Sequence, residues 1–123
     1  EKDNNMANDF KRICTPSIGT SLTTIYAVPA GPSSAALESI VIGITMANKT
    51  TSGVTASIWI DNEDGSNDVW IVKDASIPAG SSLEVMAGNK LVLMNDGSNA
   101  DNLEALASAT SSVDVTVSVL EDV

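Results

Sequence analysis

The clearest pattern along the chain is a strict alternation of apolar and polar residues near its C-terminal end. In Ser112–Glu121 a valine stands at every second position from Val113 to Val119, and the residues between them are polar. Successive side chains of a β-strand point to opposite faces, so a period of two puts these valines on one face. The pattern is typical of an antiparallel strand with one face in a core and the other in water.

A second long strand is predicted over Leu37–Asn48, where large apolar residues also recur with a period of two. The residues expected to share one face are Ile40, Ile42, Ile44 and Met46. Gly43 lies on the opposite face and indicates a β-bulge or a close approach of the backbone.

The remaining apolar segments are short and are separated by small or polar turn residues. Asp68–Asp74 contains four consecutive apolar residues, which favours a strand buried on both faces. Asp101–Ser108 fits either a strand or one helical turn. The other predicted strands are Thr23–Val28, Val54–Ile60, Leu83–Met86 and Leu91–Met94.

These segments predict an all-β protein with about eight short strands and turn signals roughly every 8–12 residues. The length of 123 residues suits one domain with one core. We therefore expect a single antiparallel β-sandwich of jelly-roll or immunoglobulin-like topology. No segment has the length and periodicity of the helices that a βαβ fold requires.

The first part of the chain differs from the rest, because Glu1–Ser21 has few apolar residues and no periodicity. We expect an extended N-terminal arm over residues 1–21 and the β-sandwich domain over 22–123. Such an arm is either a frayed terminus or a segment that docks on a neighbouring subunit. The candidate interface residues of the arm are Phe10, Lys11, Arg12, Ile13 and Ile18.

The charge of the chain is strongly negative, with 16 acidic and 6 basic residues and a net charge of −10. Residues 1–12 contain three of each sign, so the remainder of the chain carries all of this charge. A body of this charge repels phosphate backbones and anionic lipid, which predicts binding to neither nucleic acid nor a membrane. No apolar run approaches the roughly 20 residues that span a bilayer.

The residue types present do not favour a catalytic site. The chain has no histidine, which removes the commonest general base and most transition-metal sites. Its single cysteine, Cys14, excludes an internal disulfide, and no histidine is present to activate its thiol. We predict a non-enzyme with no catalytic residues, no cofactor and no metal site.

Acidic residues do cluster in places that read as turns. Asp-Gly-Ser-Asn occurs twice, at Asp64–Asn67 and Asp96–Asn99, and these residue types favour turns for reasons of backbone geometry. The connection Asp61–Asp68 is wholly polar and is interpreted as a solvated acidic loop. A loose Ca²⁺ site at its tip is the alternative, because carboxylate oxygens suit that ion, although the EF-hand spacing is absent.

Trp59 and Trp70 flank this acidic connection and complete the candidate interface. Paired tryptophans on a β-sandwich can stack on sugar rings, which would make the chain a carbohydrate-binding module. The alternative is that each covers a sheet face or lies in a subunit interface, where tryptophan is enriched.

The order of several short motifs resembles that of small virion structural proteins of tailed bacteriophages, of the type abundant in marine and cyanobacterial phages. The motifs are MANDFKR, TTIYAVPA, SIVIGITMAN, VWIVKDASIPAGSSLEVMAGNKLVLMNDG and SSVDVTVSVLED, and together they cover most of Met6–Val123. Many relatives place Gly-Asp before the penultimate strand, where this chain has the longer segment Asp96–Asp101.

The resemblance implies a non-enzymatic structural protein of the virion, assembled in the host cytoplasm. It implies first a capsid decoration or cement protein on the head exterior, and second a tail, neck or fibre-associated component. The expected partners are other virion proteins, namely major capsid or tail proteins. The chain itself is expected to form a homo-oligomer, with a trimer favoured.

Overall fold

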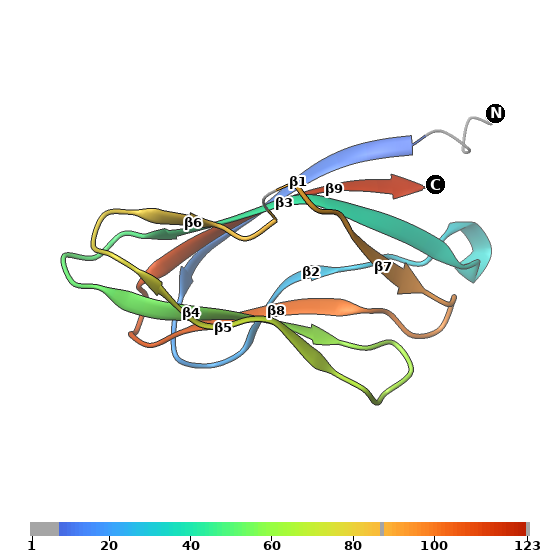
Figure 1. Ribbon diagram of the computed structural model, residues 1–123. Helices are drawn as coiled ribbons and strands as arrows, with labels where there is room; N and C mark the ends of the chain where they lie inside the picture. The colour runs from blue at the N-terminus through green and yellow to red at the C-terminus, as the bar shows by residue number, and fades with distance from the viewer. Residues whose placement is uncertain (1–7, 87, 123) are drawn as a thin grey trace.

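The computed structural model describes residues 8–86 and 88–122, and the strands within these residues form two antiparallel sheets packed face to face (Figure 1). The five-stranded sheet contains β1 (Asn8–Ile18), β9 (Val113–Asp122), β3 (Leu37–Asn48), β6 (Ser82–Glu84) and β7 (Leu91–Asn95). The four-stranded sheet contains β2 (Thr23–Ala27), β8 (Asn102–Ala107), β4 (Val54–Asp61) and β5 (Val69–Ile77). A 3₁₀ turn, η2 (Pro32–Ser34), follows β2. The predicted antiparallel sandwich is confirmed.

The strand order identifies the topology as a jelly roll. The sheets read β1-β9-β3-β6 and β2-β8-β4-β5, and β7 also pairs with β3. Because β6 and β7 pair with successive parts of β3, they share one strand position, which gives the eight positions of a jelly roll. In an immunoglobulin-like sandwich the first two strands lie in the same sheet, whereas β1 and β2 lie in opposite sheets here.

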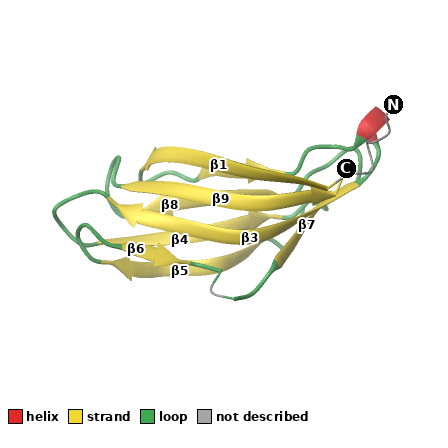
Figure 2. Ribbon diagram, turned by 90° about the horizontal axis from the view of Figure 1, so that it is seen from above, coloured by secondary structure: helices red, strands yellow, loops and turns green. Residues whose placement is uncertain are grey.

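The N-terminal segment does not form an arm separate from the sandwich. Residues 8–18 are β1, which pairs antiparallel with β9 along the margin of the five-stranded sheet (Figure 2). The boundary predicted between residues 21 and 22 is therefore wrong for the described part of the arm, and residues 1–7 of that prediction lie outside the described residues. The segment looked unstructured because an edge strand tolerates proline and exposes most of its side chains.

The core lies between the sheets and is lined by the inward residues of both. The alternating valines of β9 are all at most 1% exposed, as their spacing predicted. The ambiguous segment Asp101–Ser108 forms the strand β8, whose alternation directs Leu103, Ala105 and Ala107 into the core.

A bulge in β3 corrects the predicted face of two isoleucines. The register against β9 shifts between Val41 and Gly43, so Ile42 is an extra residue. Ile44 is fully buried, whereas Ile42 is 41% exposed. A bulge inverts the alternation on either side of itself, and so Ile40 and Ile42 lie on the outer face.

Strand β5 is also more exposed than its apolar sequence suggests. Val69 is 50% and Trp70 is 38% exposed, which contradicts the predicted burial on both faces. The reason is its position, since β5 is the edge of its sheet. No helix within residues 8–86 and 88–122 has the length and hydropathy needed to cross a membrane.

Candidate functional site

Four apolar side chains form a row across the outer face of the five-stranded sheet. Taken in register from β1 to β7, they are Phe10, Leu120, Ile40 and Val92, which we call the apolar row. Phe10 is 73% and Val92 is 57% exposed. Exposed apolar side chains that gather into a patch are a common mark of an interaction surface.

Two further apolar side chains widen this surface on either side of the row. Met94 of β7 is 46% exposed and Ile42 of the β3 bulge is 41% exposed. A shallow depression of ≈ 390 Å³ borders the row, and its lining residues are Phe10, Lys11, Arg12, Ile42, Ser118 and Val119. Apolar and cationic side chains therefore meet at the β1 end of the row.

The candidate interface residues of the N-terminal segment divide between the two faces of β1. Phe10 and Arg12 are exposed on the outer face, opposite Leu120 and Ser118. Ile13 faces the other way and packs against the core.

Ile18 is not an interface residue, because it is 1% exposed and belongs to the core. The physical reason is an irregularity between Thr15 and Ile18, where Ser17 has a φ of 60°. The irregularity changes the alternation and turns Ile18 inward.

A buried polar network, absent from the sequence-based prediction, connects the two sheets beneath β1. The Tyr26 hydroxyl donates to Glu121 Oε2 at 2.6 Å, and Ser39 Oγ lies 2.6 Å from the same hydroxyl. Because the phenol proton goes to Glu121, Ser39 is the donor to Tyr26. The Lys11 ammonium lies 2.9 Å from Glu121 Oε1. The buried carboxylate therefore has both a hydrogen-bond donor and a cation.

This network shifts the pKa values of two members. Burial, reinforced by the hydrogen bond to Glu121, raises the pKa of Tyr26 far above its ordinary value. The hydrogen bond to Glu121 raises the pKa of Lys11 as well. The sequence held one signal for the network, since Glu121 continues the inward alternation of the β9 valines. A charge at an inward position requires a partner.

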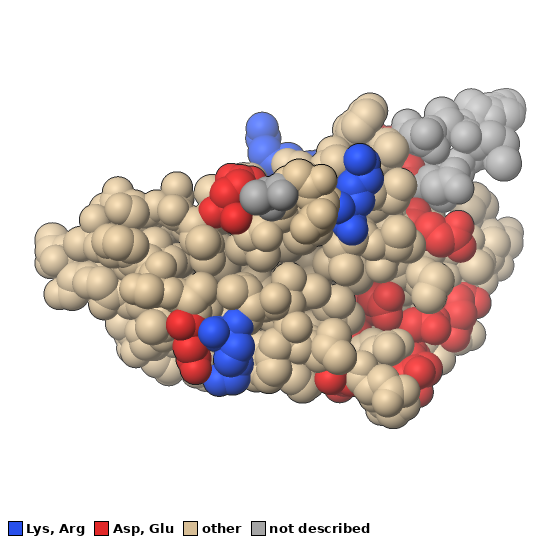
Figure 3. All heavy atoms as spheres, in the orientation of Figure 1, with Lys and Arg blue, Asp and Glu red and all other residues tan. Residues whose placement is uncertain are grey.

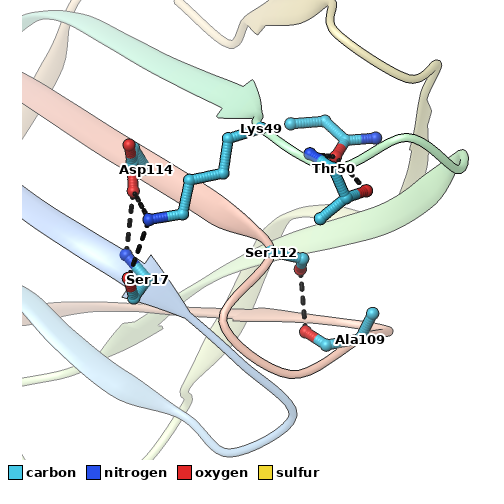
Figure 4. Close-up of polar contacts among 7 residues, drawn as sticks. Ser17, Lys49, Thr50, Ala109, Ser112 and Asp114 are labelled. Carbon is cyan, nitrogen blue, oxygen red and sulfur yellow. Dashed lines mark hydrogen bonds and ion pairs between the residues drawn. The ribbon is translucent and has the colours of Figure 1, made fainter.

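A second polar cluster connects the C-terminal end of β1 to β9 (Figure 4). The Lys49 ammonium donates to Ser17 Oγ at 2.8 Å and lies 2.9 Å from Asp114 Oδ1. The Ser17 N–H also donates to Asp114, at 2.9 Å, and this bond together with Lys49 lowers the pKa of Asp114. An ion pair therefore holds β1 against β9 near its N-terminal end, and hydrogen bonds of Ser17 to Asp114 and Lys49 hold its C-terminal end.

The two tryptophans lie in the four-stranded sheet, in the layer opposite the apolar row. Trp59 and Trp70 are a cross-strand pair of β4 and β5, with ring centroids 4.7 Å apart and planes at 65°. Lys73 Nζ lies 5.1 Å from the centroid of Trp70. The rings are not coplanar, so the pair resembles the edge-to-face packing of sheet-stabilising aromatics and not a flat platform for sugars.

The acidic turns use their carboxylates as backbone caps. Asp64 accepts the N–H of Ser66, and Asp96 accepts those of Ser98 and Asn99, each at 2.8 Å. Both Asp-Gly-Ser-Asn segments are therefore turns, as predicted. Figure 3 shows acidic side chains gathered at the end of the molecule where β4 and β5 connect.

The candidate Ca²⁺ site receives no support from this arrangement. Within the part of the chain that the structure describes, no three His, Cys, Asp or Glu side chains gather closely enough to hold a metal ion. Asp68 accepts the N–H of Asn62 at 2.7 Å, and the buried Asp101 accepts that of Glu63 at 2.6 Å. These carboxylates hold the loops in place.

Comparison with known proteins supports the class of fold. No family model and no curated sequence matches the chain. A protein of the disulfide-linked pili that form Bacillus endospore appendages superposes with a TM-score of 0.50 and 16% identity, over 94% of this chain and 87% of that one. A chain of infectious bursal disease virus, Gx strain, gives a TM-score of 0.44 and 15% identity, and the match spans 35% of its length. The pilus match is a likeness of fold, and the class it supports is a β-sandwich.

Proposed function

We propose that this protein is a non-enzymatic structural subunit of a tailed-phage virion, and specifically a capsid decoration protein that binds the exterior of the head. Its partners in this role are the major capsid protein and further copies of itself. The proposal extends the sequence resemblance, whose motifs cover most of the chain, and a jelly roll is a fold suited to such a subunit.

The observation that carries the proposal is the apolar row. A sheet face that exposes Phe10 and Val92 in one register line is unusual for a surface that faces only water. A row that crosses four strands is about 14 Å wide at the usual strand spacing, which suits contact with a flat protein surface. The acidic end of the molecule remains available to face solvent.

The test is binding of the purified protein to capsids that lack it, followed by co-sedimentation. A deletion of residues 1–21 is unsuitable, because it removes β1 and leaves Glu121 without Lys11. We use Val92→Glu instead, which places a charge in the row on the strand remote from β1. The matched control is Val69→Glu on β5, where the replaced valine is similarly exposed at 50%.

Val92→Glu should abolish sedimentation with capsids, and Val69→Glu should leave it intact. Equal binding by both variants would overturn the assignment of the row as the docking face. Quantitative mass spectrometry of virions separates head from tail, because decoration requires copies in the hundreds. A few dozen copies or fewer would instead identify a tail, neck or fibre-associated component. Absence from virions would overturn both.

A further inference from the structure

The four margins of the two sheets differ in their capacity to accept another strand. β2 is 5 residues long and has an irregularity between Thr24 and Tyr26. β5 is interrupted by two register shifts. The margin beyond β3 is divided between β6, which is 3 residues long, and β7, which is 5 residues long. By contrast, β1 pairs without a shift from Asn8 to Thr15. Bulges and short strands protect edges from pairing, so β1 is the least protected margin.

The outward side of β1 is also uncovered. Within the described residues, the backbone hydrogen bonds of the straight part of β1 run to β9 alone. Figure 2 shows β1 along the margin of its sheet, with none of the other described strands beyond it. Lysine on an edge strand usually discourages pairing, but the Lys11 ammonium is held 2.9 Å from Glu121 and its charge is compensated.

We propose that β1 pairs antiparallel with β1 of a second copy, around a two-fold axis at Phe10, and joins two five-stranded sheets into one. This contact between copies goes beyond the proposed function. Only its role on the virion rests on that function, and the dimer itself does not. It replaces the trimer that the sequence resemblance implies with a two-fold dimer.

Charge complementarity selects this register. A two-fold axis puts one residue of β1 opposite its own copy, so an axis at Asp9, Lys11 or Arg12 would oppose like charges. An axis at Phe10 instead brings Asp9 opposite Lys11 of the second copy, and it does so twice. Asp9 and Lys11 share one face of β1, since their side chains already approach to 3.9 Å within the chain. Opposite charges directly across a strand pair are stabilising.

The backbone excludes the alternatives nearer the C-terminal end of β1. An axis at Ile13 or Cys14 would bring Pro16 into the ladder, and proline has no N–H to donate. It would also bring in Ser17, whose φ of 60° is not that of a strand. The axis at Phe10 uses only Asn8–Arg12 of the described strand, which is straight.

The exposure of Phe10 fits the same geometry. Phe10 has Leu120 as a cross-strand neighbour on one side and none on the other, which leaves it 73% exposed. Pairing across the edge would supply Phe10 of the second copy, and aromatic cross-strand pairs are among the favourable ones. The apolar row would then continue through both subunits.

Disulfide trapping tests the register by comparing a cysteine placed at position 10 with the native Cys14. In the variant Phe10→Cys/Cys14→Ser the two thiols face each other across the axis, within the Cα separation that a disulfide requires. In the native chain the two Cys14 residues would lie about 27 Å apart, at about 3.4 Å per residue along the strand. Both positions are exposed on the same face of β1, so each is the matched control of the other.

We expect mild oxidation of the purified protein to give a covalent dimer of the variant and to leave the native chain monomeric on a denaturing gel. Trapping through Cys14 instead, or through neither, would overturn the pairing. These outcomes are independent of capsid binding, so a failure here leaves the docking test with Val92→Glu unaffected.

A charge reversal tests the contact without a cysteine. Asp9→Lys places lysine opposite Lys11 twice and should weaken dimerisation about tenfold in analytical ultracentrifugation. Glu38→Lys makes the same charge change on the outer face of β3 and should leave the dissociation constant within about twofold of the parent. Equal dissociation constants for the two variants would overturn the proposed register.

Discussion

Tyr26 of one sheet donates a 2.6 Å hydrogen bond to the carboxylate of Glu121 in the other sheet. Both residues are buried, and the bond crosses the core between the two sheets. The same carboxylate binds Lys11, so the network that connects the layers also holds the edge strand β1. The stability of the sandwich and the availability of the β1 edge therefore depend on one set of side chains.

Removing the Tyr26 hydroxyl should destabilise the protein. In Tyr26→Phe, Glu121 loses a donor and Ser39 loses an acceptor, and a buried polar group without a partner costs about 1–3 kcal/mol. We expect a loss of this size in the free energy of unfolding measured by urea titration. In a Glu121→Gln background the same change should cost less, because groups in contact are coupled by about 0.5–3 kcal/mol. Additive losses would show that Tyr26 and Glu121 act separately.

The protein should lose stability in alkali. The pKa of Tyr26 is raised from its ordinary value of 10.0 by burial and by Glu121, and that of Lys11 is raised from 10.5 by Glu121. A raised pKa in the folded state gives stability that is complete below the unfolded value and is lost as pH rises through the folded value. The free energy of unfolding should therefore fall as pH rises above about 10. Tyr26→Phe should flatten that fall, and an unchanged slope would contradict the assignment.

The ion pair between Lys49 and Asp114 should contribute little to stability, and that contribution should be lost at low pH. The Ser17 N–H and the Lys49 ammonium lower the pKa of Asp114 from 3.8, so its contribution is present above that value and is lost as pH falls through the folded pKa. The Asp114 side chain is 46% exposed, and exposed pairs contribute at most about 1 kcal/mol. Asp114→Asn should cost less than this at neutral pH and should flatten the acid limb of the stability profile.

Two glycines with positive φ should respond differently to alanine. A Cβ on Gly97, whose φ is +101°, would meet the carbonyl oxygen of Ser34. Gly80 has a φ of +69° and open space around it. Gly80→Ala should therefore cost only the conformational penalty of about 1–2 kcal/mol, and Gly97→Ala should cost more because the backbone must also move. Equal midpoints in thermal unfolding would show that the turn at Gly97 adjusts freely.

The sequence alone determined the elements whose side-chain pattern is decided locally. The valines of β9 alternate without interruption, so their period of two fixed both the strand and its buried face. The two Asp-Gly-Ser-Asn turns could also be predicted from the sequence, because Asp64 and Asp96 accept hydrogen bonds from the backbone of their own turns. In both cases the interactions that specify the structure lie within a few residues of one another.

The tertiary structure decided everything that depends on a partner strand. An extra residue at Ile42 and an irregularity before Ile18 reversed the predicted faces, because a strand keeps its alternation only as far as its register with a neighbour is unbroken. The segment around Phe10 looked like an arm because edge strands bury little of their own surface. The sequence marked Glu121 only as a charge at an inward position, and its partner Tyr26 was decided by the tertiary structure, because a contact across 95 residues of sequence leaves no local pattern.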